Sequence, residues 1–212
     1  MVECPAFSAN FKDRVSTHVP AVPRLVVTQG DPEGIGPELL LRLGDAGALV
    51  RGDRVVADRG RLDRLARALA TPWALRGRDV LAPLLVDEPA GQVAALARGV
   101  DLVLADPAGA ALVTAPIDKA RCRAEGFTFP GHTEYLAARS HTEDFAMLMV
   151  GPRLRVVPVT IHVPLRAVPD LLTSAAIVRA GRLLGHALHH HFGVAAPRVG
   201  VLGLNPHAGE QG

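Results

Sequence analysis

From residue 24 onward, short apolar runs alternate along the chain with longer segments of helical periodicity. Buried strands are indicated at 24–28, 55–57 and 111–114, where Val, Leu and Ala dominate. The segment 61–70 repeats leucine on one face of a helix. Strands that alternate with helices are typical of an α/β fold with a mostly parallel sheet, whose ligands bind beyond the carboxyl ends of the strands. We therefore predict this fold class.

The remaining expected elements continue the alternation. Further helices are predicted at 38–43, 92–98 and 174–191, and further strands at 145–150, 154–160 and 198–204. A Gly-Pro turn at 151–152 joins two of these strands. The run 80–86 is a strand at the edge of the sheet or a loop, because Pro83 cannot donate a hydrogen bond to a neighbouring strand.

The composition is that of a globular protein and excludes several classes of partner. The chain has 212 residues, of which 49% are hydrophobic, enough for a core in one or two domains. A net charge of +2 gives no electrostatic case for binding nucleic acid. No apolar run reaches the roughly 18 residues that a membrane span needs. Residues 1–23 are polar and aperiodic, so we expect a mobile leader there that is not a signal peptide.

The cysteines and the histidine run carry little functional signal. Cys4 and Cys122 offer neither a disulfide framework nor metal-type spacing, which favours a reducing, cytoplasmic location. Three consecutive histidines at 189–191 fall at the end of a predicted helix. We interpret them as a solvated helix end rather than a metal site.

The segment 30–38, GDPEGIGPE, follows the first predicted strand. Its glycines, including Gly34 and Gly36, allow positive φ and close backbone approach, and Pro37 suits the first turn of a helix. Such a turn at a helix N-terminus favours an anion, so Asp31 and these glycines are candidates for a phosphate-binding or cofactor-side loop. The dinucleotide fingerprint spacing is absent, and a tight turn that merely starts a helix is the competing interpretation.

Two further segments contain candidate anion-binding residues. Lys119 lies just past the strand predicted at 111–114, where it could bind a phosphate or carboxylate or transfer a proton; the alternative is a surface lysine. At 130–134 a helix is predicted to begin near His132 and Thr133. A histidine beside exposed helix N–H groups suits a phosphate ester, and a simple capping turn is the alternative.

Two other histidines follow predicted strands. His162 comes after the strand at 154–160, and His207 comes after the strand at 198–204. Two imidazoles at strand ends could converge on a divalent metal, although separated histidines have no local ligand spacing, and a structural role is the competing interpretation that the residues alone favour.

Together these segments resemble the 4-hydroxythreonine-4-phosphate dehydrogenase family. The motifs that carry the resemblance are GDPEGIGPE (30–38), PIDK (116–119), FPGHTEYLA (129–137), IHVPLR (161–166) and LNPHAGE (204–210). GHTE and NPHAGE are specific to it, whereas isocitrate and isopropylmalate dehydrogenases have a turn related to GDPEGIGPE. The resemblance extends from about Val26 to Gly212.

This resemblance implies an isopropylmalate-dehydrogenase-like fold, with two α/β/α lobes, a cleft between them and a homodimer. Residues 24–130 would form the first lobe and 131–212 the second, interface-forming lobe. The implied reaction is the oxidation of 4-phosphohydroxy-L-threonine by NAD or NADP, followed by decarboxylation to 3-amino-2-oxopropyl phosphate. Related enzymes act on phosphorylated four-carbon sugar acids or aromatic dihydrodiol carboxylates, and the sequence does not choose among these substrates.

The resemblance also implies roles for individual residues. His132 and Thr133 match a substrate-binding pair, and His162 and His207 match two of three ligands for zinc, magnesium or cobalt. Lys119 matches a lysine near the cleft. Family members continue beyond the motif that ends this chain, so the C-terminal part of the first lobe and the third metal histidine are expected to be missing. The competing interpretation is a catalytically inactive remnant.

Overall fold

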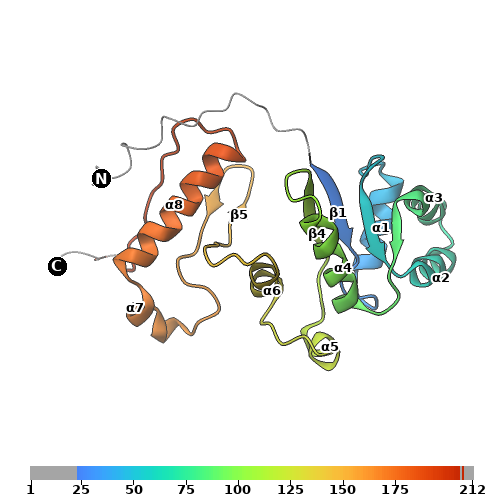
Figure 1. The fold of residues 1–212 in the computed structure, drawn as a ribbon, viewed down its shortest axis with the longest axis horizontal. Helices are drawn as coiled ribbons and strands as arrows, with labels where there is room; N and C mark the ends of the chain where they lie inside the picture. The colour runs from blue at the N-terminus through green and yellow to red at the C-terminus, as the bar shows by residue number, and fades with distance from the viewer. Residues whose placement is uncertain (1–22, 206, 208–212) are drawn as a thin grey trace. The chain divides into compact units, whose positions relative to one another are not determined.

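The computed structural model describes residues 23–205 and 207, so almost all of the predicted leader lies outside the described residues. Contacts within the chain divide it into two units, of which the first ends at Pro130 and the second begins at Gly131 (Figure 1).

The first unit contains a parallel four-stranded sheet. Its strands are β1 (Arg24–Thr28), β2 (Arg54–Ala57), β3 (Leu85–Asp87) and β4 (Ala110–Thr114), in the order β3-β2-β1-β4. In the register of the central strand, Val27 pairs with Val55 on one side and with Val113 on the other. The predicted α/β class with a parallel sheet is therefore confirmed.

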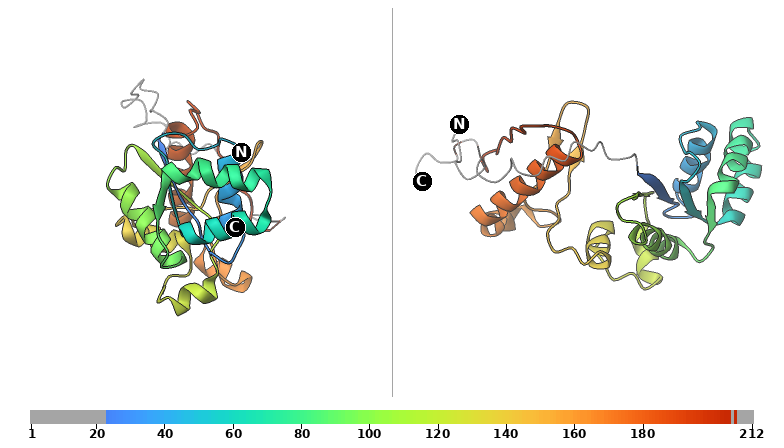
Figure 2. Two further views of the ribbon diagram at one scale, coloured as in Figure 1. Left: turned by 90° about the vertical axis from the view of Figure 1, so that its right-hand side faces the viewer. Right: turned by 45° about the horizontal axis from the view of Figure 1, so that its top comes forward.

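Helices cover both faces of this sheet, because side chains alternate across it along each strand. Val27 packs with Leu40 of α1 (Gly36–Asp45), and the same cluster includes α2 (Arg59–Leu69) and α3 (Pro72–Leu81). Val26, the next residue along β1, packs on the opposite face with Ala95 of α4 (Gln92–Leu104). The result is a three-layer α/β/α unit (Figures 1 and 2).

Helices α1 and α3 cross closely through glycine. A Cβ atom on Gly77 would lie 2.0 Å from the carbonyl oxygen of Leu41, and one on Gly44 would lie 2.5 Å from the carbonyl oxygen of Gly77. Both contacts are with backbone, which cannot move aside as the end of a side chain can. Gly77 is therefore required by packing, although glycine weakens an isolated helix.

We expect Gly77→Ala to lower the free energy of unfolding by about 1–3 kcal/mol through overpacking. The measurement is urea unfolding followed by the fluorescence of Trp73, the only tryptophan in the chain, which packs against the core of the first unit. The control is Gly60→Ala in α2, where a Cβ would meet only the side-chain ends of Arg64 and Asp58 at 3.1 and 3.2 Å. An equal loss of stability in both variants would contradict the packing argument.

Most of the regular structure in the second unit is helical, and few of its described side chains are buried. Its elements are α6 (His132–Arg139), β5 (Met149–Val150), β6 (Arg155–Val156), the 3-10 helix η4 (Leu165–Ala167), α7 (Val168–Leu171) and α8 (Ser174–His190). Strands β5 and β6 form an antiparallel hairpin. The hydroxyl of Thr173 caps α8 by accepting a hydrogen bond from the backbone N–H of Ala176 at 3.1 Å.

Several predicted elements differ from the structure. The run 80–86 belongs to the end of α3, the 3-10 helix η3 (Ala82–Leu84) and the short edge strand β3. The strands predicted at 145–150 and 154–160 shrink to the two-residue strands β5 and β6. No strand forms at 198–204, all of which is described; Val201, Leu202 and Leu204 are exposed there, so no apolar face is buried that would fix a strand.

Candidate functional site

The loops that follow β1 and β4 lie side by side at the carboxyl edge of the sheet in the first unit. The backbone N–H of Asp31 donates to the carbonyl of Pro116 at 2.9 Å, and that of Ala115 donates to the carbonyl of Thr28 at 3.1 Å. These bonds extend the pairing of β1 with β4 beyond the strands themselves. The two predicted segments at 30–38 and 114–119 are thereby brought together, at the edge where parallel sheets bind ligands.

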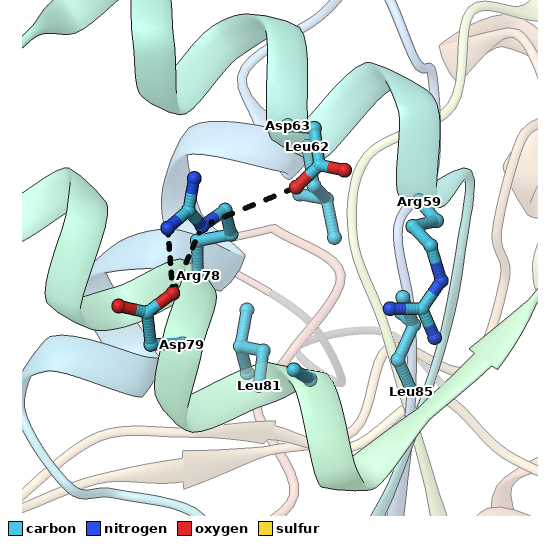
Figure 3. Close-up of a pocket in the computed structure, with 8 residues that line it drawn as sticks. Arg59, Leu62, Asp63, Arg78, Asp79, Leu81 and Leu85 are labelled. Carbon is cyan, nitrogen blue, oxygen red and sulfur yellow. Dashed lines mark hydrogen bonds and ion pairs between the residues drawn. The ribbon is translucent and has the colours of Figure 1, made fainter.

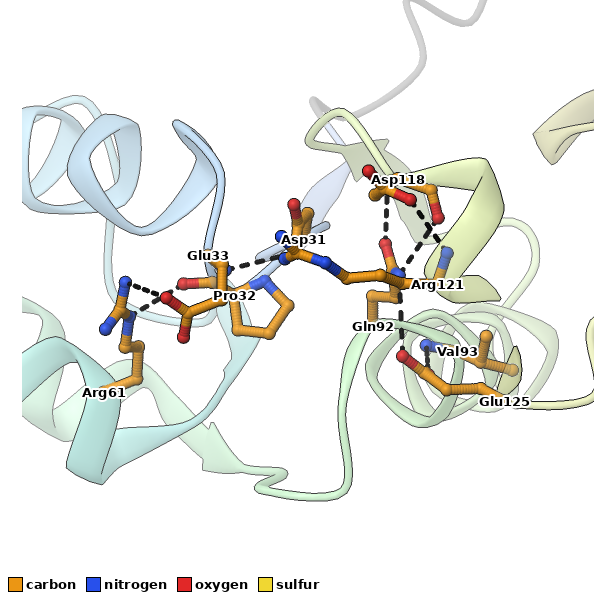
Figure 4. A network of polar contacts seen from close by, with 9 residues as sticks. All are labelled: Asp31, Pro32, Glu33, Arg61, Gln92, Val93, Asp118, Arg121 and Glu125. Atoms are coloured by element: carbon orange, nitrogen blue, oxygen red, sulfur yellow. Dashed lines mark hydrogen bonds and ion pairs between the residues drawn. The ribbon is translucent and has the colours of Figure 1, made fainter. Parts of the chain in front are cut away.

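Asp31 organises this edge through its carboxylate. Its Oδ1 accepts hydrogen bonds from the backbone N–H of Glu33 at 3.1 Å and from Nη1 of Arg121 at 2.7 Å (Figure 4). The Asp31 side chain is 12% exposed and that of Arg121 is 51% exposed, so the ion pair lies at the boundary with solvent. It ties the loop after β1 to α5 (Lys119–Ala124).

The coupling between Asp31 and Arg121 can be measured by a double-mutant cycle. With Asp31→Ala, Arg121→Ala and the double variant, we expect a coupling energy of about 1 kcal/mol, since the carboxylate is largely desolvated and the bond is charge-assisted. The surface pair Arg76–Asp45, 2.9 Å apart, is the control and should couple by about 0.5 kcal/mol or less. Urea unfolding followed by Trp73 fluorescence gives both values, and a coupling no larger than that of the control would count against the organising role.

The glycines of the first loop are explained by contacts within the chain. Gly30 has a φ of +67°, and a Cβ there would lie 2.2 Å from the carbonyl oxygen of Pro116. A Cβ on Gly36 would lie 1.8 Å from the carbonyl oxygen of Gln29. Gly34 is exposed, and its nearest neighbours are atoms of Asp31. The tight-turn interpretation therefore accounts for Gly30 and Gly36, and the ligand-binding role of Asp31, Gly34 and Gly36 stays a prediction.

A second polar network fixes the start of α5. The side chain of Gln92 is buried; its amide donates to the carbonyl of Asp118 at 3.1 Å, and its oxygen accepts from the N–H of Asp118 at 2.9 Å (Figure 4). The Asp118 carboxylate in turn caps α5 by accepting from the N–H of Arg121 at 2.8 Å. Lys119 follows as the first residue of α5 and is exposed. Its backbone is held firmly, while its side chain is presented to solvent.

Contacts of Gln29 and Arg61 connect the end of β2 to the same edge. The side-chain oxygen of Gln29 accepts from the N–H of Asp58 at 2.9 Å, and its amide nitrogen is buried without a hydrogen-bond partner among the described residues. Arg61 donates to the carbonyl of Pro32 at 2.8 Å and pairs with Glu33 at 2.9 Å (Figure 4). The loop after β1 is therefore held from both sides.

Cys122 lies beneath this edge as a buried thiol that is 2% exposed. Burial raises its pKa, and the nearby carboxylates of Glu125, Asp118 and Asp31 raise it further. The thiol stays protonated at neutral pH, so it is a weak nucleophile and does not suit covalent catalysis.

His132 and Thr133 are the first two residues of α6 in the second unit, as predicted. Gly131 occupies the capping position and supplies no side-chain hydrogen bond, and Glu134 lies in the first turn. Both His132 and Thr133 are partly buried. The predicted helix start is confirmed, and the predicted phosphate site at this end stays a prediction.

His162 and His207 are exposed, and neither follows a strand directly. His162 lies in a bend with a φ of +57°, beyond the end of β6 at Val156. The backbone N–H of His207 donates to the side-chain oxygen of Asn205 at 3.1 Å. Among the described residues, no group of three or more His, Cys, Asp or Glu side chains is arranged to hold a metal ion. The metal-binding role of this pair stays a prediction, and its placement at strand ends was wrong.

A small hollow in the first unit lies away from all these residues. It has a volume of about 60 Å³ and lies between α2 and α3, as Figure 3 shows. Arg78 lines it, paired with Asp79 at 2.7 Å and 4.0 Å from Asp63. The hydrogen bond and charge of Asp79 raise the pKa of the Arg78 guanidinium. Ligand pockets are usually several hundred Å³ in volume, so this hollow is too small to hold a substrate or a dinucleotide.

Comparison with known proteins decides the family. The model of the family described as pyridoxal phosphate biosynthetic protein PdxA matches residues 83–212. Two curated relatives are named 4-hydroxythreonine-4-phosphate dehydrogenase: one from Zymomonas mobilis, 37% identical over 89% of this chain, and one from Aromatoleum aromaticum, 39% identical over 91%. The chain belongs to the PdxA family. The resemblance seen in the sequence motifs is thereby confirmed.

Solved structures of the PdxA family agree with this assignment. The crystal structure of 4-hydroxythreonine-4-phosphate dehydrogenase from Klebsiella pneumoniae matches 93% of this chain with a TM-score of 0.74 and 30% identity. A putative 4-hydroxythreonine-4-phosphate dehydrogenase from Salmonella typhimurium matches 90% with a TM-score of 0.73 and 28% identity. The chain spans about 63–64% of the length of the curated PdxA relatives and 66–67% of these two structures.

The PdxA family match covers part of the candidate site. The matched residues include Lys119, His132, Thr133, His162 and His207, but not the loop at 30–38. Arg121 and Gln29, which hold that loop in place, were not identified from the sequence. The position of Gln29, directly after a predicted strand, was the one available signal for it.

Among the described residues, no helix has the length and apolar character needed to cross a membrane.

Proposed function

We propose that this chain serves the oxidation and decarboxylation of 4-phosphohydroxy-L-threonine to 3-amino-2-oxopropyl phosphate in pyridoxal 5'-phosphate biosynthesis, with NAD or NADP as oxidant and a divalent metal ion as cofactor. The observation that carries the proposal is the 37–39% identity, over 89–91% of this chain, to proteins named 4-hydroxythreonine-4-phosphate dehydrogenase. A two-lobed isopropylmalate-dehydrogenase-like fold and a cytoplasmic location belong to the same proposal.

The proposed reaction has two steps. In the first, the secondary alcohol loses a hydride to NAD(P)⁺ and a proton to a base, which gives a β-keto acid. In the second, the bond to the carboxyl carbon breaks, carbon dioxide leaves, and a proton replaces it. We assign the substrate phosphate to His132 and Thr133 at the start of α6, because the N-terminal end of a helix and an imidazole both favour an anion. Lys119 is proposed as a second phosphate-binding or proton-handling group.

The chain offers two candidate metal ligands and one candidate cofactor-side loop. His162 and His207 offer two imidazoles, which suit zinc or cobalt, but the described residues bring no group of three donors together. Asp31, Gly34 and Gly36 are proposed as the cofactor-side loop. In support, this loop lies at the N-terminus of α1, which no side chain caps and where Ile35 is 58% exposed.

The exposed apolar side chains of the hairpin support a proposed homodimer. Met149, Val150 and Leu154 are 51%, 55% and 69% exposed, and side chains of this kind are usually covered in the assembled protein. Sedimentation equilibrium tests this part of the proposal. A second copy should be bound at micromolar concentration, and Val150→Asp together with Leu154→Asp should shift the protein to monomer. A monomer at all concentrations would refute the dimer.

The test of activity compares this chain with a version extended by the C-terminal region of a relative. NAD(P)H formation is followed with 4-phosphohydroxy-L-threonine in the presence of zinc or magnesium. We expect turnover from the extended chain and little from this chain alone. The added region is expected to complete the first lobe and so the positioning of the substrate, and correct positioning accounts for several kcal/mol of a typical barrier reduction. Turnover by neither chain would favour the inactive remnant, whereas equal turnover would show that the active site was misplaced.

The phosphate assignment has a separate test that needs no turnover. Inorganic phosphate is titrated into the protein, and the backbone amide of Thr133 is followed by NMR. We expect its resonance to shift in the parent protein and to shift much less in His132→Ala. A response that His132→Ala leaves unchanged would place the phosphate elsewhere.

A further inference from the structure

Four histidines gather at the C-terminal end of α8: His186, His189, His190 and His191. The ring centroids of His186 and His190 are 4.3 Å apart with an interplanar angle of 37°, so the two rings lie roughly side by side. The ring of His191 is farther from His186, at 6.3 Å, and meets it edge-on. Desolvation, followed by the charges of the other three histidines, lowers the pKa of His190.

The spacing of His186 and His190 explains their proximity. Residues four apart are neighbours on the same face of an α-helix, with Cβ atoms about 5–6 Å apart. Both side chains are exposed, so rotation about their own bonds can bring one nitrogen of each ring toward a common point in solvent. His189 differs from them, because it is partly buried and its Nδ1 lies 3.3 Å from the carbonyl oxygen of Val194.

We propose that His186 and His190 form a surface site for a divalent transition-metal ion, with Zn²⁺, Ni²⁺ or Cu²⁺ as the fitting class of ligand. Imidazole nitrogen suits these ions and holds them at about 2.0–2.1 Å in zinc sites. With centroids 4.3 Å apart, the two rings are close enough for one ion to contact a nitrogen of each after the side chains rotate. Water completes the coordination, since the described residues contain no group of three or more potential ligands.

This site draws on neither His162 nor His207, so it is independent of the proposed catalytic metal. Its physical consequence is local. An ion held by residues of two successive turns binds the folded helix and not the unfolded segment, so it stabilises the end of α8. The segment that had been interpreted as a solvated helix end thereby becomes a metal-responsive element.

The first test is calorimetric titration of Zn²⁺ at pH 7.5 into protein that carries His162→Ala and His207→Ala, which removes the other candidate ligands. Adding His186→Gln or His190→Gln should each weaken binding by roughly tenfold or more, because each removes one of two ligands. His191→Gln is the matched control and should change the affinity by less than about threefold, since removal of a non-ligand costs little free energy. Equal effects of all three substitutions, or none, would overturn the proposal.

A second measurement uses the unaltered chain and does not depend on the folding of variants. Paramagnetic Cu²⁺ is added below one equivalent, and the broadening of backbone amide signals is mapped by NMR. We expect one centre of broadening at residues 186–190, in addition to any at His162 or His207. If the amides of α8 keep their line widths while others broaden, the proposed site does not bind the ion.

Discussion

Gly30→Ala is expected to lower the free energy of unfolding of the first unit by about 3 kcal/mol, from the sum of a strained backbone and a clash. Gly30 has a φ of +67°, and the added Cβ would lie 2.2 Å from the carbonyl oxygen of Pro116. That carbonyl accepts the hydrogen bond from Asp31 that joins the two loops, so it cannot move without separating them. Urea unfolding followed by Trp73 fluorescence measures the effect.

Gly47→Ala separates the two causes. Gly47 has nearly the same backbone conformation, with a φ of +61°, but no atom lies within 4 Å of the position of its Cβ. This variant should lose only the conformational part, about 1 kcal/mol. The difference between the variants then measures how tightly the loops after β1 and β4 are held together. If both variants lose the same free energy of unfolding, the close approach at Pro116 does not contribute to stability.

The first unit could be predicted from the sequence because its signals are local. The strands at 24–28 and 55–57 are short apolar runs, and they became the central strands β1 and β2, buried on both faces. In 61–70, leucines recur at helical spacing. This segment belongs to α2, and its Leu62 packs into the core. Such elements satisfy both their own periodicity and the packing of the sheet, so local pattern and tertiary structure agree.

Helix α3 shows where local patterns fail. Thr71 accepts a hydrogen bond as the capping residue and Pro72 is the first residue of the helix, so start signals were present in the sequence. The helix then places the small residues Ala74 and Gly77, together with Leu81, against its neighbours. Glycine is normally a sign against a helix, and only the close contact with Leu41 explains why it is needed.

The contacts of the candidate site are harder to predict from the sequence than the secondary structure is. Asp31 and Arg121 are 90 residues apart, and they meet only because β1 and β4 are neighbours in the sheet. The strand order depends on packing of the whole unit. In the second unit, the apolar run at 198–204 had the composition of a strand but remains exposed. A strand forms only where a partner edge is available, and composition does not supply that partner.

Asp53→Ala is expected to cost the first unit about 3 kcal/mol of stability, since it leaves two backbone N–H groups without their acceptor. Asp53 is 3% exposed. Its Oδ1 accepts from the N–H of Leu25 at 2.8 Å, and its Oδ2 accepts from the N–H of Val50 at 2.8 Å. One carboxylate therefore ties the start of β1 to the turn that leads into β2. The measurement is again urea unfolding followed by Trp73 fluorescence.

Two further variants show whether these hydrogen bonds cause the loss. Asp53→Asn keeps the shape and one acceptor oxygen but points an amide donor at the second N–H, so it should recover only part of the stability. Asp87→Ala removes a carboxylate that accepts a single bond from the N–H of Arg59 in an exposed setting, and should cost about 1 kcal/mol or less. The order Asp87→Ala, Asp53→Asn, Asp53→Ala in increasing loss follows from the number of N–H donors left unpaired and from the burial of the carboxylate that is removed. If Asp53→Ala were no worse than Asp87→Ala, water would have to reach both N–H groups, and the tie between β1 and β2 would not depend on this carboxylate.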